Sequence, residues 1–288
     1  MIGLSTITRS AWKSDTFERA VLKLRSISGT SRYRKFVIVG TARTGSTLLI
    51  NLLRGHSQVR VFGELFRSPE AIGWDVKPFA TLQSFDVVSL YRADPVAFLE
   101  NHVFRRWPRP CGAVGFKLFY YHARTPEHSV VWDYLAADPE IRVLHLRRRN
   151  LLAQYYSLRL AHQTNSWTKA AVPKGDPAPM RLGPQECQDH FGWVRALEEE
   201  CAAFFGRHDV YDIWYEDLVA EQEQTMTGIQ EFLGLARYVA KPTIARQRTT
   251  PLRLAIANYD DLSKALHETP WSVFFDEEDV GGAERRRG

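Results

Sequence analysis

Short apolar runs recur along this chain and alternate with longer segments of helical periodicity. The clearest run, residues 36–39, is unbroken and ends at Gly40, and further candidate strands cover residues 113–119, 141–146 and 210–214. An unbroken apolar run is typical of a parallel strand that is buried on both faces. Strands that alternate with helices in this way predict an α/β fold, in which a parallel sheet is flanked by helices.

Helices are predicted where apolar residues recur at a spacing of three or four. Residues 46–54 (STLLINLLR) have leucines at positions 48, 49, 52 and 53, which is close to the pattern of a helix packed on a sheet. Further helices are expected at residues 17–27, 94–106, 127–137, 150–162, 184–205 and 221–233, with Gly234 after the last of them as a C-terminal cap.

The pattern predicts one domain over residues 1–288, with residues 1–34 as a leading helix and extension. Residues 164–184 contain four prolines and two glycines, which predicts a long loop rather than a linker between domains. We expect this loop on the acceptor side of the site discussed below. The end of the chain, residues 281–288 (GGAERRRG), is expected to be a flexible tail.

The composition is that of an ordinary globular protein. Of 288 residues, 44% are hydrophobic and 25% are charged, which excludes disordered and collagen-like chains. The net charge of +5 suits an anionic ligand but is too small for a nucleic-acid coat. Three scattered cysteines and the absence of a long apolar run predict a soluble protein of the reducing cytoplasm.

A glycine loop follows the first predicted strand. From Gly40 the chain reads GTARTGST, the spacing of a phosphate-binding P-loop with Ser46 in place of the motif's lysine. Backbone N–H groups at a helix N-terminus favour an anion, and the hydroxyl groups of Thr44, Ser46 and Thr47 add donors. Arg43 places a permanent charge inside the loop, whereas the missing lysine argues against triphosphate hydrolysis. A tight turn without a ligand is the alternative.

These residues resemble a known family. Residues 41–48 (TARTGSTL) are similar to the 5′-phosphosulfate loop of sulfotransferases that use 3′-phosphoadenosine 5′-phosphosulfate (PAPS), in the arginine-bearing form of bacterial carbohydrate sulfotransferases. Residues 143–157 are similar to the second motif of that family. Segments at 213–218 (IWYEDL), 229–235 (IQEFLGL) and 248–271 resemble further parts of nodulation-factor and trehalose sulfotransferases. Alone, the arginines at 147–149 would read as a solvated charge run.

The resemblance implies a P-loop-like fold that binds PAPS and releases adenosine 3′,5′-bisphosphate. It assigns the phosphosulfate of the donor to residues of the glycine loop, namely Arg43, Thr44, Gly45, Ser46 and Thr47. It assigns the 3′-phosphate to Arg149 and Ser157, and it implies that Arg248 or Arg253 closes over the nucleotide. No metal is expected, because a sulfuryl group carries less negative charge than a phosphoryl group.

Three residues are the expected catalytic groups. Arg43 would neutralise the charge that develops on the bridging oxygen of the leaving group. Glu64 stands where carbohydrate sulfotransferases similar to this chain carry a glutamate base, and Lys117 lies inside an apolar strand, near the acceptor or the leaving group. A surface carboxylate and a lysine that extends to solvent are the structural alternatives for these two. His122 is a weaker candidate base.

The expected partner is a carbohydrate, glycolipid or other hydroxyl acceptor, and this expectation rests on the resemblance. No nucleic acid is expected, membrane contact would be peripheral if the acceptor is a lipid, and a homo-oligomer stays open. Six aromatic residues could line an acceptor cleft or pack in the core, namely Tyr120, Tyr121, Tyr155, Tyr156, Trp167 and Trp193. Two other functions stay open: a nucleotide or sugar kinase, and a non-catalytic phosphonucleotide-binding module.

Overall fold

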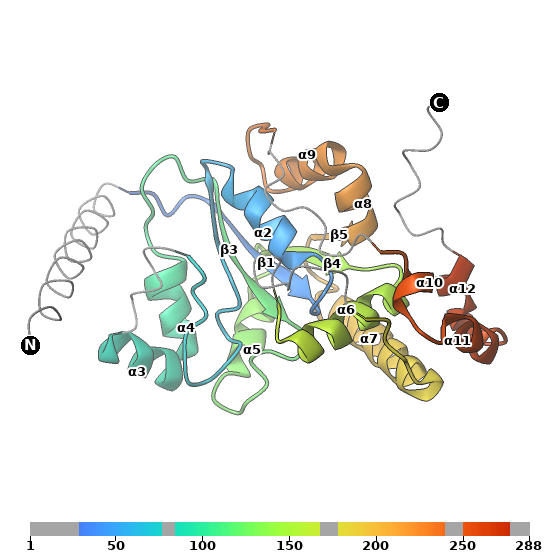
Figure 1. The fold of residues 1–288 in the computed structure, drawn as a ribbon. Helices are drawn as coiled ribbons and strands as arrows, with labels where there is room; N and C mark the ends of the chain where they lie inside the picture. Colours follow the sequence, from blue (N-terminus) through green and yellow to red (C-terminus); the bar gives the residue numbers. More distant parts are fainter. Residues whose placement is uncertain (1–28, 77–83, 168–177, 240–249, 277–288) are drawn as a thin grey trace, which may run out of the picture.

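The computed structural model describes residues 29–76, 84–167, 178–239 and 250–276. Its centre is a sheet of five parallel strands in the order β2-β3-β1-β4-β5 (Figure 1). The strands are β1 (Arg34–Gly40), β2 (Val59–Phe62), β3 (Ala113–Phe119), β4 (Arg142–Arg147) and β5 (Val210–Trp214). The prediction of an α/β fold with a parallel sheet is therefore confirmed.

The central strand β1 is buried because its apolar residues alternate between two layers of core. Val37 and Val39 belong to one hydrophobic cluster, with α4 (Pro95–Phe98) and α5 (Val130–Ala137). Phe36 and Ile38 belong to a second cluster on the other face, with α2 (Ser46–Arg54) and α9 (Gln222–Phe232). All four side chains are at most 1% exposed, as the unbroken apolar run predicts.

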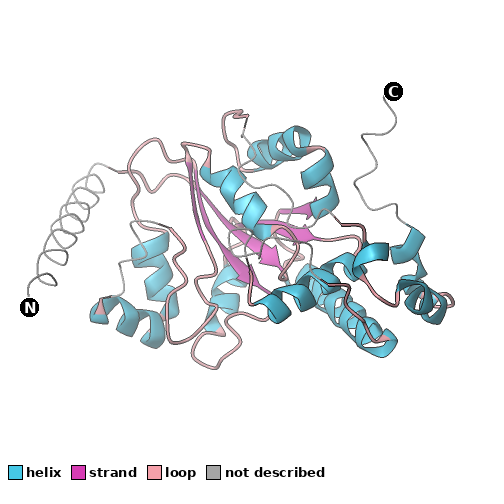
Figure 2. Ribbon diagram, viewed as in Figure 1, coloured by secondary structure: helices cyan, strands magenta, loops and turns pink. Residues whose placement is uncertain are grey.

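Helices cover both faces of the sheet, as Figure 2 shows. A third hydrophobic cluster joins α6 (Leu151–Thr164), α7 (Pro184–Phe204), α10 (Leu252–Ala255), α11 (Tyr259–Leu266) and α12 (Val273–Asp276) beside the sheet. The remaining helical elements are α3 (Phe85–Ala93), the π-helical turn Leu99–Val103, α8 (Tyr215–Ala220) and the 3₁₀ turn Pro270–Ser272. Among the described helices, none is long and apolar enough to cross a membrane.

The predicted elements agree with the structure except at a few places. The helix expected at 94–106 is wrong in its extent, because α4 gives way to a π-helical turn that ends before Phe104. The sequence pattern did not predict β2, α3 or the helices after residue 250. The leading helix at 17–27 and the tail at 281–288 lie outside the described residues, as do residues 168–177 of the predicted loop at 164–184.

The carboxyl ends of all five strands meet at one edge of the sheet, because the strands are parallel. The glycine loop follows β1, Glu64 follows β2, His122 follows β3 and Arg149 follows β4. At the end of β1 a Cβ atom on Gly40 would lie 2.5 Å from the carbonyl oxygen of Leu146 on β4, so this close approach requires glycine. In open α/β sheets, ligands bind at this edge.

Candidate active site

The glycine loop turns from β1 into α2 through two residues with left-handed backbone conformation. Arg43 has a φ of 66° and Gly45 a φ of 84°. A Cβ atom on Gly45 would lie 2.4 Å from the ring of Tyr215. Glycine is therefore required there both by the positive φ and by the lack of space. Thr44 Oγ1 donates to the carbonyl oxygen of Thr41 at 2.7 Å. Gly45 is the N-cap of α2 and has no side chain to cap it, which leaves N–H groups of the first turn for an anion.

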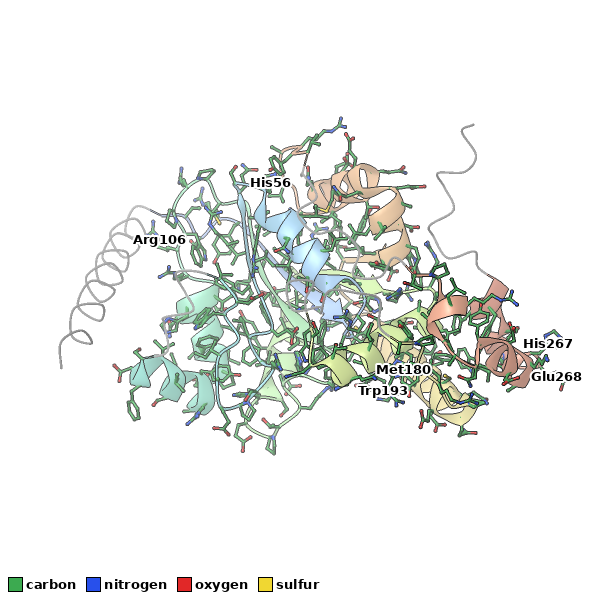
Figure 3. All side chains as sticks on the ribbon, in the orientation of Figure 1. His56, Arg106, Met180, Trp193, His267 and Glu268 are labelled. Carbon is green, nitrogen blue, oxygen red and sulfur yellow. The ribbon has the colours of Figure 1, made fainter. Side chains whose placement is uncertain are left out.

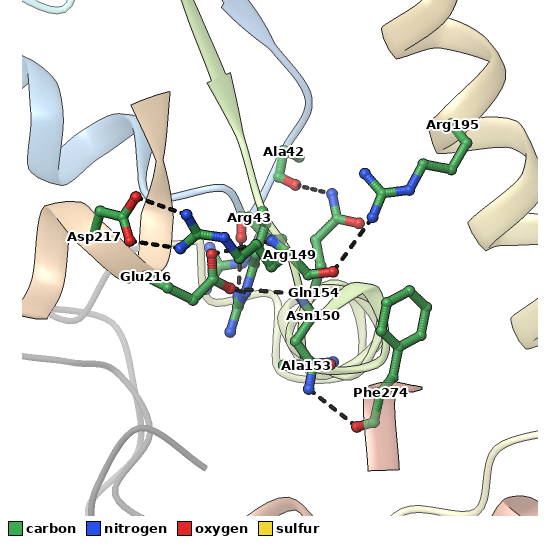
Figure 4. A network of polar contacts seen from close by, with 11 residues as sticks. Ala42, Arg43, Arg149, Asn150, Ala153, Gln154, Arg195, Glu216, Asp217 and Phe274 are labelled. Carbon is green, nitrogen blue, oxygen red and sulfur yellow. Dashed lines mark hydrogen bonds and ion pairs between the residues drawn. The ribbon is translucent and has the colours of Figure 1, made fainter. Parts of the chain in front are cut away.

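The backbone of Ala42, next to Arg43, is held on both sides. Its N–H group donates to the hydroxyl oxygen of Tyr121 at 3.2 Å. Its carbonyl oxygen accepts from Nε2 of Gln154 at 2.8 Å (Figure 4). Gln154 is fully buried, and its Oε1 lies 3.1 Å from Nε2 of His190. Sequence reasoning missed Gln154, whose only signal is a polar residue inside the apolar first half of α6.

The Arg43 side chain spans from the glycine loop to α6 and the residues after it. Its Nε donates to Ser157 Oγ at 2.9 Å, and one of its NH groups donates to the carbonyl oxygen of Trp167 at 2.9 Å. Burial lowers the pKa of Arg43, and the nearby Arg148 cation lowers it further. Two guanidinium groups therefore lie close together at the loop. An anion that binds between or beside them offsets their mutual repulsion.

Lys117 and Glu64 form an ion pair at the start of α2. Lys117 Nζ lies 2.8 Å from Glu64 Oε1 and donates to Ser46 Oγ at 3.2 Å. The Lys117 side chain is 6% exposed and that of Glu64 is 27% exposed, so the lysine is enclosed and the carboxylate can be reached. Ser46 occupies the position of the P-loop lysine, so the neighbouring strand β3 supplies an ammonium group where α2 lacks one. The structure thus brings Glu64, Lys117 and Ser46 together.

Arg149 and Ser157, predicted to hold one phosphate, have different partners in the structure. Arg149 forms a bidentate ion pair with Asp217, at 2.5 and 2.8 Å (Figure 4). Glu216 accepts the backbone N–H groups of Arg149 and Asn150 and so fixes the start of α6. Ser157 instead accepts from Arg43, and none of the described contacts joins it to Arg149. The expectation that both contact the 3′-phosphate stays a prediction.

The sequence profile of the sulfotransferase family matches residues 35–238, which include the glycine loop, strands β2 to β5 and all of β1 except its first residue. The chain belongs to the sulfotransferase family. Nodulation protein H of Rhizobium tropici is 26% identical, over 85% of this chain and 94% of its own length. Trehalose 2-sulfotransferase of Mycolicibacterium smegmatis is 25% identical, over 74% of this chain and 89% of its own length. The solved sulfotransferase of Alicyclobacillus acidocaldarius is 16% identical at a TM-score of 0.45, over 86% of this chain and 92% of that one.

The sequence predicts that Arg248 or Arg253 closes over the nucleotide of this sulfotransferase. Arg248 lies outside the described residues. Arg253 lies on α10, where its guanidinium pairs with Asp260 at 2.9 Å and its side chain is 71% exposed. Contact of either arginine with a nucleotide therefore stays a prediction.

We expect His122 to make the stability of this sulfotransferase depend on pH. Burial lowers the pKa of His122 to about 4, although Glu64, whose Oε2 lies 3.8 Å from its Nε2, acts in the opposite direction. Below an ordinary histidine pKa of about 6.5, the unfolded chain binds a proton at this site that the folded chain excludes. Stability that is present above pH 6.5 is therefore lost as the pH falls towards about 4.

We expect His122→Asn to remove this part of the pH dependence. Between pH 7.5 and pH 4.5, the wild type should lose about 2 kcal/mol more of its free energy of unfolding than the variant does. Urea unfolding of both proteins at the two pH values measures the difference, and other titrating groups cancel because both proteins share them. If both proteins lost the same free energy of unfolding between these pH values, His122 would not be the source of this pH dependence.

Proposed function

We propose that this sulfotransferase transfers a sulfuryl group from PAPS to a hydroxyl group of a carbohydrate or glycolipid. The observation that carries the proposal is that Lys117 contacts both Ser46 of the glycine loop and the carboxylate of Glu64. An anion-binding loop and an accessible proton acceptor are thus parts of one cluster. The name of one relative, trehalose 2-sulfotransferase, supports a sugar as the class of acceptor.

The described residues suit the anionic donor. The N–H groups at the start of α2, the half-buried Arg43 and the adjacent Arg148 provide positive potential for a phosphosulfate group. Asp217 holds the Arg149 guanidinium at the same edge of the sheet. We assign the binding of the 3′-phosphate to Arg149 and Ser157. The three cysteines are free, which fits the reducing cytoplasm in which we place the reaction.

The proposed step is an in-line displacement at sulfur. The acceptor oxygen forms a bond to sulfur while the bond between sulfur and the bridging oxygen of the 5′-phosphate breaks. The electron pair of the broken bond stays on that oxygen, where Arg43, Lys117 and the loop N–H groups stabilise it. The proton of the acceptor hydroxyl passes to Glu64. The products are a sulfate ester and adenosine 3′,5′-bisphosphate.

Transfer of ³⁵S from labelled PAPS to a panel of disaccharides, glycolipids and phenols tests this function directly. We expect labelled product with a carbohydrate acceptor and tighter binding of adenosine 3′,5′-bisphosphate than of ATP. Binding that favours ATP, or an absence of transfer to every acceptor, would reject the proposal.

Alanine in place of Arg149 should separate the two phosphates of the nucleotide. Loss of a charge-assisted contact to the 3′-phosphate should weaken the binding of adenosine 3′,5′-bisphosphate on the order of tenfold to hundredfold. Binding of 5′-AMP, which lacks that phosphate, should change by less than about threefold. Isothermal titration calorimetry measures both.

The matched control for Arg149→Ala is Arg237→Ala, since Arg237 forms an exposed pair with Glu223 away from the loop. This control should leave both affinities unchanged. Equal losses for the two nucleotides in Arg149→Ala would assign Arg149 to the fold rather than to the 3′-phosphate.

A further inference from the structure

Two half-exposed aromatic rings lie stacked beside the cluster of Glu64, Lys117 and Ser46. Tyr121 follows β3 and is 40% exposed, and Trp193 on α7 is 44% exposed. Their ring centroids are 5.9 Å apart and the ring planes differ by 24°. Side chains of this size are mostly buried in folded proteins, so a flat exposed pair next to reactive groups points to a ligand surface.

The inner end of this pair is attached to the residues of the proposed reaction. The Tyr121 ring packs edge-on against His122, at 5.2 Å between centroids, and His122 Nε2 lies 3.8 Å from Glu64 Oε2. The Tyr121 hydroxyl accepts the N–H group of Ala42, next to Arg43 in the glycine loop. A molecule that lies on these rings therefore has one end beside the proposed proton acceptor.

Two further rings on α7 and α6, tilted rather than stacked, continue this contact outwards. Trp193, labelled in Figure 3, contacts His190 at 5.7 Å between centroids, and His190 contacts Tyr155 at 4.6 Å. At the outer end, Arg159 donates to the Tyr155 hydroxyl at 2.9 Å and to Glu186 at 2.8 Å. Tyr155 is only 7% exposed and supports the ring of His190. We call Tyr121, Trp193 and His190 the aromatic strip.

The chemistry of the aromatic strip suits a neutral sugar better than a charged ligand. Burial lowers the pKa of His190 to about 4, so its ring is uncharged at neutral pH. The C–H face of a pyranose ring packs on aromatic faces, while its hydroxyl groups point outwards. Charged side chains lie near both ends of the strip: Glu64 and Arg67 near Tyr121 and His122, and the Arg159–Glu186 pair beside Tyr155.

We propose that the aromatic strip is the acceptor subsite and that it binds an oligosaccharide of at least two rings. One ring lies on Tyr121 and Trp193 and presents its hydroxyl group to Glu64, and the next ring extends towards Arg159 and Glu186. This inference rests on the proposed sulfuryl transfer, and it adds the residues that select the acceptor.

Trp193→Ala, compared with Trp193→Phe, tests the subsite. With the best carbohydrate acceptor of the panel, the alanine variant should raise KM about tenfold, and phenylalanine should restore most of the loss because a ring face remains. The affinity for adenosine 3′,5′-bisphosphate should stay unchanged in both variants. Phe85→Ala is the matched control, because Phe85 is 85% exposed on α3, far from the site.

Saturation-transfer NMR with maltose, cellobiose and trehalose, in the presence of adenosine 3′,5′-bisphosphate, gives a readout that does not need turnover. Transfer to ring C–H protons should be seen with wild type and lost in Trp193→Ala. An unchanged KM and an unchanged NMR signal, no signal from any sugar, or sulfation of phenols alone would overturn the subsite while leaving donor binding intact. Failure of the wild type to bind the nucleotide would instead reject the proposed function.

Discussion

Alanine in place of Arg43 is expected to slow sulfuryl transfer on the order of 10²- to 10³-fold. Negative charge develops on the bridging oxygen as its bond to sulfur breaks. The Arg43 guanidinium is already ordered for that charge, because Ser157 Oγ and the carbonyl oxygen of Trp167 hold two of its N–H groups. A preorganised donor of this kind stabilises the transition state more than the ground state. The measurement is kcat for ³⁵S transfer at saturating PAPS.

The same substitution should leave the protein at least as stable as the wild type. Burial and the Arg148 cation both lower the pKa of Arg43, which means that its charge is disfavoured in the folded protein. In the described part of the chain, Arg43 has no ion pair with a carboxylate to offset this cost. A protein is often stabilised when a residue that serves ligand binding is replaced. We therefore expect an unchanged or higher Tm for the variant in calorimetry without nucleotide.

Two further variants make the result for Arg43 specific. Arg43→Lys keeps a cation in the loop and should keep a larger share of activity than alanine does, although it loses the two-sided anchoring. Arg237→Ala removes an exposed arginine and should transfer at the wild-type rate. Near-normal turnover in Arg43→Ala would remove this residue from the mechanism.

The sequence predicts an element well where the apolar residues of that element are buried in a regular pattern. The predictions at 46–54, 113–119 and 210–214 coincide with α2, β3 and β5. By contrast, β2 has only four residues at the edge of the sheet, and only Tyr91 is buried on α3, so both leave weak patterns. Within 94–106 the apolar spacing cannot distinguish an α-helix from the π-helical turn, in which Phe104 N–H bonds to the Leu99 carbonyl at 2.7 Å.

For the site, the sequence predicts the groups but not their partners. The glycine loop, Glu64 and Lys117 can be found from local motifs, and the structure brings them to one edge of the sheet. The contact between Arg43 and Ser157 spans 114 residues, and that between Gln154 and Ala42 spans 112. Such contacts depend on how the helices pack on the sheet, which local periodicity does not encode.

Glutamine in place of Glu64 is expected to lower kcat on the order of 10²- to 10⁴-fold, because an amide cannot accept the proton of the acceptor hydroxyl. Binding of adenosine 3′,5′-bisphosphate should persist, since the glycine loop and its arginines are unchanged. The amide oxygen can still accept a hydrogen bond from Lys117, whose Nζ lies 2.8 Å from Glu64 Oε1. The variant should therefore fold, with some loss of stability because the enclosed ammonium group loses its counter-charge.

Comparison with two other variants decides which group is the base. Glu70→Gln removes an exposed carboxylate that pairs with Arg92 and should not change kcat. His122→Asn removes the rival candidate and should change kcat by less than about tenfold, because the imidazole is enclosed and its pKa lies near 4. A large loss in His122→Asn with a small one in Glu64→Gln would exchange the two roles. Equal large losses would mean that both groups act as one unit, because non-additive effects are typical of residues that move the same proton.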